Sequence, residues 1–322
     1  MRSSTLDLFP HTRVLVIGDA MLDRYLFGKA TRLCPEGPVP VVAIDRVSSM
    51  PGGAANTAVN LAKLGAVTVS LLSVIGTDLK SSILQQHLIK SGVDTEMVIV
   101  DPERKTLAKQ RIIANNQLVV RFDEGSTTTI SGHLEGELSY LLRKDAALMD
   151  AVVVSDYSYG VCTLGLIKDL RNQFPVVVVD SKRLTAYRHL GPTAVKPNYA
   201  EAIALLNLPV VPDRVTQMRS QGEALLAATG AKVVVVTLDR DGALTFEAGQ
   251  PPHHTPARPA PDDHAIGAGD TFVSALTLAL AAGATGKEAT AIASAATAVV
   301  VQSPGTTACC LSDLKSRLEQ PL

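Results

Sequence analysis

The sequence predicts an α/β protein with a doubly wound, mainly parallel sheet flanked by helices. Short apolar runs that each end in a polar residue recur along the chain, and segments with helical periodicity lie between most of them. Strands buried on both faces have this continuous apolar character, and their carboxyl ends meet at one edge of the sheet. A polar residue after one strand is often only a turn former, but five together favour a functional site along that edge. The five runs are residues 13–19, 152–156, 176–180, 194–198 and 233–237.

Two segments outside this alternation, about residues 24–50 and 97–122, predict a small β-sheet lid. Prolines and an alternating tail exclude a helix from the first segment and indicate short strands. The second is typical of a hairpin that turns at Asn115 and Asn116. A lid with an apolar face must cover either a substrate or the lid of a second subunit, so we expect a homodimer formed through the lid. Residues 1–322 are otherwise expected to form one domain.

The first long helix is expected from Ala54 to Leu64, with Gly65 as its stop. Gly52 and Gly53 precede it and offer bare backbone amides, while Asn56 can both donate and accept hydrogen bonds. These groups suit the polar groups of a ligand, although they also fit an ordinary helix start.

A second helix with the same kind of start is expected from Thr271 to Ala282. The small residues before it are Gly267, Ala268 and Gly269. Free N–H groups and the helix dipole favour an anion over these residues. Asp270 would repel a resting phosphate, but it is well placed to take a proton from a hydroxyl that attacks one. The alternative is that Asp270 only adds negative charge to the first helical turn.

Composition restricts the class of partner. The chain is 46% hydrophobic over 322 residues, enough to bury a sizeable core, and its net charge of −1 gives no basic field for nucleic acid or an acidic membrane. No apolar run reaches transmembrane length, and no signal-peptide pattern precedes the first strand, so a small-molecule partner and a cytoplasmic location are expected. The cysteines lack metal spacing; Cys309-Cys310 is either a redox pair or two incidental thiols.

Two of these motifs resemble those of the ribokinase-like (PfkB) sugar kinases. Residues 267–272 (Gly-Ala-Gly-Asp-Thr-Phe) look like the C-terminal signature of that family, and residues 51–56 (Pro-Gly-Gly-Ala-Ala-Asn) look like its N-terminal signature. The resemblance implies a ribokinase-like fold and a phosphotransferase that uses ATP and Mg²⁺ to phosphorylate a sugar hydroxyl. It also implies that Asp270 is the catalytic base, and that the amides of Gly267, Ala268 and Gly269 form an anion hole.

The same resemblance implies roles for residues elsewhere. The sugar would be held by Asp19, Asp23, Gly52, Gly53 and Asn56; Asp19 is the better placed of the two aspartates because it directly follows a strand. The nucleotide would be held by Asn198, Glu201, Thr237 and Gly242, with Glu201 holding Mg²⁺ through water. The small-residue helix 287–302 and the Ser303-Pro-Gly305 turn would line adenine, or would serve only as core.

Within the family, the chain is similar to the D-glycero-β-D-manno-heptose 7-phosphate kinases, in their stand-alone form. The supporting motifs are residues 18–25, 32–41, 51–56, 155–157 and 196–198. This resemblance implies phosphorylation of C1 to the 1,7-bisphosphate, in ADP-heptose synthesis for lipopolysaccharide core. Asp156 and Lys182 join the substrate-binding candidates. Lys109 and Arg111, and less strongly Arg32, are candidates for the 7-phosphate, since a fixed phosphate favours a guanidinium or ammonium group; solvated lid charges are the alternative.

Several positions depart from the family pattern. His264 stands where the family usually has a cation-binding aspartate, and Ile266 replaces the usual Thr or Ser, so potassium activation stays open. Residues 158–160 (Ser-Tyr-Gly) and 181–183 (Ser-Lys-Arg) differ from the Ala-Lys-Gly and Pro-Lys-Gly expected of heptose kinases. Two alternatives therefore stay open: a kinase of another sugar or sugar phosphate, and a non-catalytic protein that binds a sugar phosphate. Asp270 with its intact glycines argues against the second, because a pure binder needs no base.

Overall fold

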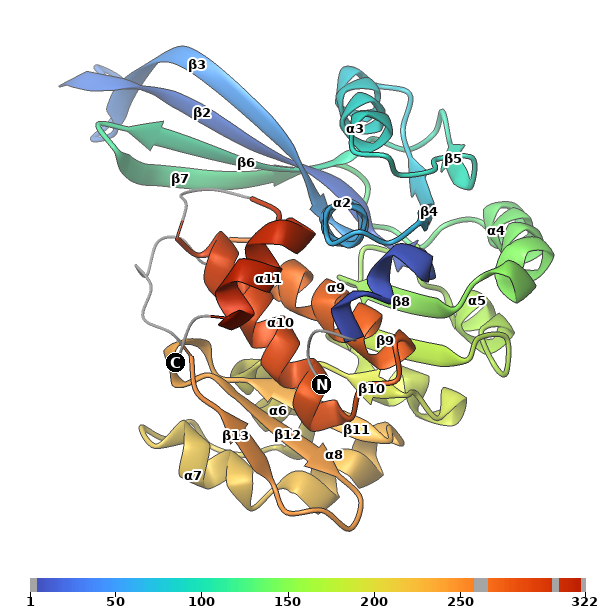
Figure 1. Cartoon of the computed structure of the whole chain (residues 1–322). Coiled ribbons are helices and arrows are strands. Elements are labelled where there is room, and N and C mark those ends of the chain that lie inside the picture. The colour runs from blue at the N-terminus through green and yellow to red at the C-terminus, as the bar shows by residue number, and fades with distance from the viewer. Residues whose placement is uncertain (1–4, 258–265, 303–306, 320–322) are drawn as a thin grey trace.

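The computed structural model describes residues 5–257, 266–302 and 307–319 (Figure 1). They form a nine-stranded sheet in the order β13-β12-β11-β10-β9-β8-β1-β4-β5, with helices on both faces, and a separate four-stranded sheet. Strand β1 is Arg13–Gly18 and its neighbours are β4 (Thr68–Ile75) and β8 (Ala151–Asp156). Because the chain leaves β1 toward β4 and later returns to β8 on the other side of β1, the sheet is doubly wound, as the sequence predicts.

All five predicted strands lie side by side and parallel at the centre of this sheet. The remaining three are β9 (Val176–Ser181), β10 (Ala194–Val195) and β11 (Val233–Thr237). The sequence reasoning missed β4, the short edge strand β5 (Val98–Val100), and the antiparallel strands β12 (Ala243–Glu247) and β13 (His253–Thr255). The carboxyl ends of the parallel strands still meet at one edge, where the site was expected.

The helices pack on the two faces of the sheet in separate apolar layers. Val14 and Val16 of β1 belong to one layer, and Leu15 and Ile17 to the other, as alternation along a strand requires. The first layer involves α2 (Ala54–Lys63), α3 (Leu79–Lys90), α9 (Ala268–Ala281), α10 (Gly286–Val300) and α11 (Leu311–Glu319). The second involves α4 (Gly132–Asp145), α5 (Leu164–Asp169), α6 (Tyr199–Leu206), α7 (Arg214–Arg219) and α8 (Gly222–Thr229). Short 3-10 turns are η1 (Phe9–His11), η2 (Ala146–Leu148), η3 (Leu184–Leu190) and η4 (Asp239–Asp241).

Two helix starts matter for the site. Helix α2 begins at Ala54, as predicted, while α9 begins at Ala268, three residues before the expected Thr271. Gly267 is the N-cap of α9 and has a left-handed φ of 80°, a conformation that favours glycine. Asp270 therefore lies inside the first helical turn, beside the free amides of that turn. In the described part of the chain, no helix is long and apolar enough to cross a membrane.

The four-stranded sheet is the predicted lid, and Figure 1 shows it extending from the top of the molecule. Its strands are β2 (Ala20–Leu33), β3 (Pro40–Gly53), β6 (Leu107–Ala114) and β7 (Gln117–Glu124), in the order β3-β2-β6-β7. The β6–β7 hairpin turns at Asn115 and Asn116, both with positive φ, as predicted. Strands β2 and β3 have 14 residues each, longer than the short strands expected. The second predicted segment began too early, because β5 pairs with β4 in the main sheet.

Candidate active site

Asp270 lies buried at the carboxyl edge of the sheet, held by two side chains from distant segments. The Asn56 amide of α2 donates to Asp270 Oδ2 at 2.7 Å, and the Tyr157 hydroxyl donates to Asp270 Oδ1 at 3.0 Å. The pKa of Asp270 is raised to about 6: burial raises it most and the carboxylates of Asp180 and Asp23 add to this, whereas the two hydrogen bonds lower it. A carboxylate with a pKa near neutrality is suited to accept a proton from a hydroxyl.

Asn56 is oriented by a chain of hydrogen bonds between α2 and α9. Asn60 Nδ2 donates to Asn56 Oδ1 at 3.1 Å, and Thr271 Oγ1 donates to Asn60 Oδ1 at 2.7 Å. This chain turns the Asn56 amide nitrogen toward Asp270. One of the two amide hydrogens of Asn56 is therefore bonded to Asp270.

A buried lysine lies beside the first turn of α9. Lys196 Nζ is 3.7 Å from the position that a Cβ on Gly269 would take, and it pairs with Asp180 at 3.1 Å. Burial favours the neutral amine, but the carboxylates of Asp180 and Glu201 dominate and raise the pKa of Lys196, so the ammonium stays charged. A cation next to free helix amides makes this an anion-binding site. Sequence reasoning gave Lys196 no role of its own, although it lies in the predicted run 194–198 and directly follows β10.

The two candidate sugar-binding aspartates have different settings. Both oxygens of Asp19 accept backbone N–H groups from the loop after β8, at 2.9 Å from Tyr157, 3.1 Å from Tyr159 and 3.1 Å from Val161. Asp19 is fully buried, and its carboxylate orders this loop.

Asp23 faces the lid interior from β2. Its Oδ1 accepts from Arg111 Nη1 at 2.7 Å, and a Cβ on Gly52 would lie 2.5 Å from its Oδ2. Position 52 therefore needs glycine, because a side chain there would collide with the carboxylate. Gly53, with a φ of 56°, adopts a backbone conformation that most residues avoid.

Asp156 lies near Asp19 at the end of β8, and Lys182 lies on the surface. Asp156 Oδ2 accepts from Ser181, from the Arg183 guanidinium and from the Tyr187 hydroxyl, so this buried carboxylate is saturated by its own fold. Lys182 is exposed, and in the described part of the chain no hydrogen bond or ion pair joins it to the site. Asp156 ends β8, as the polar end of the predicted run indicates, and its carboxylate joins that strand to Ser181, Arg183 and Tyr187.

The lid brings three basic side chains to one face, and their partners differ. Arg111 is 8% exposed and committed to Asp23, while Arg121 of β7 pairs with Asp123 at 2.9 Å. Lys109 makes no ion pair with a described carboxylate; its Nζ lies 4.7 Å from the centroid of the Tyr157 ring. Burial lowers the pKa of Lys109 more than the nearby carboxylates of Asp23, Asp123 and Asp270 raise it, which indicates a partly desolvated ammonium.

Arg32, the remaining lid candidate, is exposed near the far end of β2. It is nine residues beyond Asp23 along the same strand, on the order of 30 Å at the rise of an extended chain. Within one chain it is therefore too far to share a small ligand with Asp23.

The nucleotide candidates lie at the carboxyl ends of β10 and β11. Asn198 and Glu201 cap α6 reciprocally. Asn198 Oδ1 accepts from the backbone N–H of Glu201, and Glu201 Oε2 accepts from the backbone N–H of Asn198, both at 2.9 Å. The Thr237 amide donates to Pro197 O at 3.0 Å, which brings the two strand ends together. Gly242, with a φ of 89°, approaches Thr255 O so closely that a Cβ would be 2.1 Å from it. Asn198 with Glu201, and Thr237 with Gly242, therefore each have a structural role in the fold at the ends of β10 and β11.

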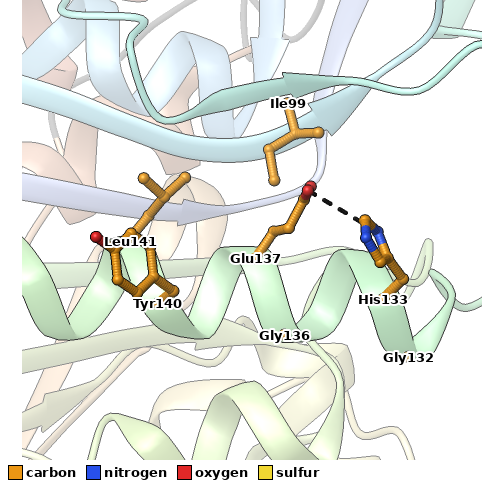
Figure 2. A pocket seen from close by; sticks show the side chains of 7 residues that line it. All are labelled: Ile99, Gly132, His133, Gly136, Glu137, Tyr140 and Leu141. Carbon is orange, nitrogen blue, oxygen red and sulfur yellow. Dashed lines mark ion pairs between the residues drawn. The ribbon is translucent and has the colours of Figure 1, made fainter.

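The expectations for metal ions and for adenine depend on other residues. Within the described ranges, no three His, Cys, Asp or Glu side chains converge to hold a metal ion, and the four cysteines are free thiols. His264 and residues 303–306, which carried the potassium and adenine expectations, lie outside the described residues. A hollow of about 630 Å³ lies on α4, near β5. Figure 2 shows the side chains that line it. The hollow carries a His133–Glu137 ion pair at 3.9 Å, and none of the candidate site residues lines it.

Solved structures with the same architecture are ribokinase-like kinases. Phosphofructokinase-2 from Escherichia coli in complex with potassium superposes with a TM-score of 0.77 at 23% identity, over 95% of this chain and 97% of that one. Ribokinase from Arabidopsis thaliana, complexed with ribose and ATP, superposes with a TM-score of 0.75 at 19% identity, over 96% and 99%. The chain therefore has the ribokinase-like fold.

Residues 11–314 match the pfkB family carbohydrate kinases, and the chain belongs to this family of phosphotransferases. Bifunctional protein HldE of Desulfatibacillum aliphaticivorans is 35% identical, over 100% of this chain and 66% of that protein. Bifunctional protein HldE of Klebsiella pneumoniae subsp. pneumoniae is also 35% identical, over 94% and 62%. The chain thus spans about two thirds of the length of these curated relatives.

Proposed function

We propose that the protein transfers the γ-phosphoryl group of ATP to the C1 hydroxyl of D-glycero-β-D-manno-heptose 7-phosphate, in the cytoplasmic synthesis of ADP-heptose for lipopolysaccharide core. The observation that carries the transfer is the buried Asp270 beside the free amides of α9 and the Lys196 ammonium. The choice of sugar is supported by the heptose-kinase motifs of the sequence and by the similarity to HldE proteins.

In this proposal the acceptor hydroxyl lies against Asp270 and gives it a proton. The hydroxyl oxygen forms a bond to the γ-phosphorus as the bond from that phosphorus to the β-bridging oxygen breaks, which leaves ADP. Negative charge on the moving phosphoryl group is met by the amides of Gly267, Ala268 and Gly269 and by Lys196. Asp23, the Gly52 and Gly53 backbone, and the second amide hydrogen of Asn56 hold the remaining hydroxyls.

The nucleotide would bind at the ends of β10 and β11, on Asn198, Thr237 and Gly242. Mg²⁺ would be held by Glu201 through water and would neutralise the β- and γ-phosphate charge. The residues fit this role. Only Oε2 of Glu201 is used in the helix cap, which leaves its second oxygen for a water ligand of Mg²⁺. The two carboxylates of Asp180 and Glu201 face one ammonium, that of Lys196, so the net charge of the three groups is negative and attracts a cation. A cation that arrives with its own water and phosphate ligands suits an edge where no protein-only metal cluster is found among the described residues.

The 7-phosphate is assigned to Lys109. Arg111 and Arg121 already have carboxylate partners at 2.7 and 2.9 Å, whereas the Lys109 ammonium is partly desolvated and unpaired among the described residues. A phosphate would bind the Lys109 ammonium directly and compensate for the water that burial has removed from it. Arg111 contributes by holding Asp23 in place.

We also propose that two copies associate through the lid. Strand β7 is a sheet edge, and it exposes Leu118, Val119, Val120 and Phe122. An exposed apolar edge strand is a ready surface for pairing with a second copy. Sedimentation of the protein as a monomer at micromolar concentration would contradict this assembly.

The function is tested by ADP release with Mg-ATP and a panel of acceptors: D-glycero-D-manno-heptose 7-phosphate, fructose 6-phosphate, ribose and adenosine, each with and without potassium. A strong preference for the heptose phosphate supports the proposal. Preferential turnover of another sugar would keep the kinase chemistry but reject the substrate, and binding without turnover of any acceptor would favour a non-catalytic binder.

A further inference from the structure

Tyr157 connects the lid, the sheet and the base. It directly follows β8, and its hydroxyl donates to Asp270 Oδ1 at 3.0 Å. Its ring stacks near that of Tyr159, with centroids 6.3 Å apart and planes 13° from parallel, and Lys109 Nζ lies over its face. Neither the strand-end pattern nor the family signatures assign this residue a task.

The backbone that carries Tyr157 is fixed at several points. Asp19 accepts the amides of Tyr157, Tyr159 and Val161, which ties the loop to the end of β1. Arg104 donates to the Tyr159 carbonyl at 3.4 Å and to Thr128 O at 2.8 Å, which ties the loop to its neighbour. The phenol therefore reaches Asp270 from a loop that is held at the switch point of the sheet.

We propose that Tyr157 is a positioning residue for the base, and that Asp19 acts on the reaction through it. A carboxylate in the first turn of a helix can rotate, and the Asn56 amide fixes only one of its oxygens. The Tyr157 hydroxyl fixes the other oxygen and favours the ionised form, which is the form that accepts a proton. An ionised carboxylate has about four acceptor sites, so two remain for the sugar hydroxyl after these bonds are made.

This inference rests on the proposed role of Asp270 as base. The carboxylates of Asp180 and Asp23 raise the pKa of Asp270. The charge of Asp270 in turn raises the pKa values of Lys109 and Lys196. A Tyr157→Phe change leaves all four in place and keeps the ring that excludes water. Only the hydrogen bond is lost, so a change in the titration of Asp270 is attributable to it.

The test compares Tyr157→Phe with Tyr159→Phe, which removes the hydroxyl from the neighbouring ring of the same stack. The pH dependence of kcat and kcat/KM is measured by ADP release, with thermal unfolding as a check of the fold. We expect Tyr157→Phe to lower kcat about tenfold and to move the acidic limb of the profile upward by roughly one pH unit, since a hydrogen bond to a charged group is lost. Tyr159→Phe leaves the limb where it is. A Tyr157→Phe limb that coincides with that of the unaltered protein overturns the inference.

A second measurement does not depend on turnover. Protein carrying aspartate labelled with ¹³C at the side-chain carboxyl is titrated by NMR without substrates, and the Asp270 resonance is assigned by its loss in Asp270→Asn. We expect its midpoint to move upward in Tyr157→Phe by the same amount as the kinetic limb. An unmoved midpoint overturns the positioning role, even if the acceptor sugar has been identified correctly. Failure of every acceptor in the turnover assay, with a moved midpoint, would instead reject the proposed function.

Discussion

The Asp270→Asn change is expected to lower the rate of phosphoryl transfer while the folded protein becomes more stable. The change keeps the size of the side chain and removes the charge that accepts the proton. A general base is worth about 10²–10⁴-fold in rate, or about 3–5 kcal/mol of activation free energy, so kcat should fall by that factor. The Kd values of both substrates should change little, because Asp23, Lys109 and Lys196 remain in place.

The same change should make the protein more stable. The folded pKa of about 6 lies about 2 units above the ordinary 3.8, so ionised Asp270 costs roughly 3 kcal/mol of folding free energy above pH 6. Because the folded pKa is raised, this cost is complete above pH 6 and disappears as the pH falls below about 4. The new amide keeps both partners: its oxygen can accept from Asn56, and its nitrogen can donate to the Tyr157 hydroxyl.

Three measurements check this prediction: single-turnover ADP formation, calorimetric binding of each substrate, and urea unfolding at pH 8 and at pH 4. We expect turnover to collapse with binding retained, and the stability gain at pH 8 to be lost at pH 4. A variant that keeps more than about a tenth of the rate would refute the assignment of the base. A variant that is less stable than the unaltered protein at pH 8 would refute the electrostatic account of the buried carboxylate.

Three further predictions follow from the same geometry. In the unaltered protein, kcat/KM should fall as the pH drops through about 6, because only ionised Asp270 can accept the proton; a profile that stays flat to about pH 5 would contradict this. Lys109→Ala should raise the KM for the sugar phosphate about tenfold or more and leave the KM for ATP unchanged; equal effects on both would remove the phosphate from the lid. Arg111→Ala should lower the free energy of unfolding by about 3–5 kcal/mol, since it leaves buried Asp23 unpaired, and unaltered urea unfolding would count against that ion pair.

Local patterns were enough to predict much of this fold. The five central strands, the start of α2 and the β6–β7 hairpin each depend on short-range signals such as apolar runs, glycine stops and the Asn115-Asn116 turn. Strand β4, the edge strands β5 and β13, and the antiparallel strand β12 were missed. Two of these have only three residues, and the added antiparallel pairing carries no local signal.

The partners of the site residues could not be predicted, because they are distant in sequence. Asn56 and Asp270 are 214 residues apart, and Tyr157 and Asp270 are 113 apart. Asp19 was expected among the sugar-binding residues, and nothing in the sequence indicated the three amides, at least 138 residues away, that bond to both of its oxygens. Asp156 and Lys196 are both polar residues that follow apolar strand residues, so the sequence does not distinguish them. In the structure the Asp156 carboxylate is bonded within the fold, whereas the Lys196 ammonium lies beside Gly269.

The most direct test of the account is ³¹P NMR of the product formed from Mg-ATP and D-glycero-D-manno-heptose 7-phosphate. We predict one new sugar phosphorus signal, coupled to the anomeric proton, alongside the unchanged 7-phosphate, and none with Asp270→Asn over the same time. A new signal coupled to a proton at another carbon would contradict transfer to C1, and no new sugar phosphate from the unaltered protein would contradict the proposed reaction altogether.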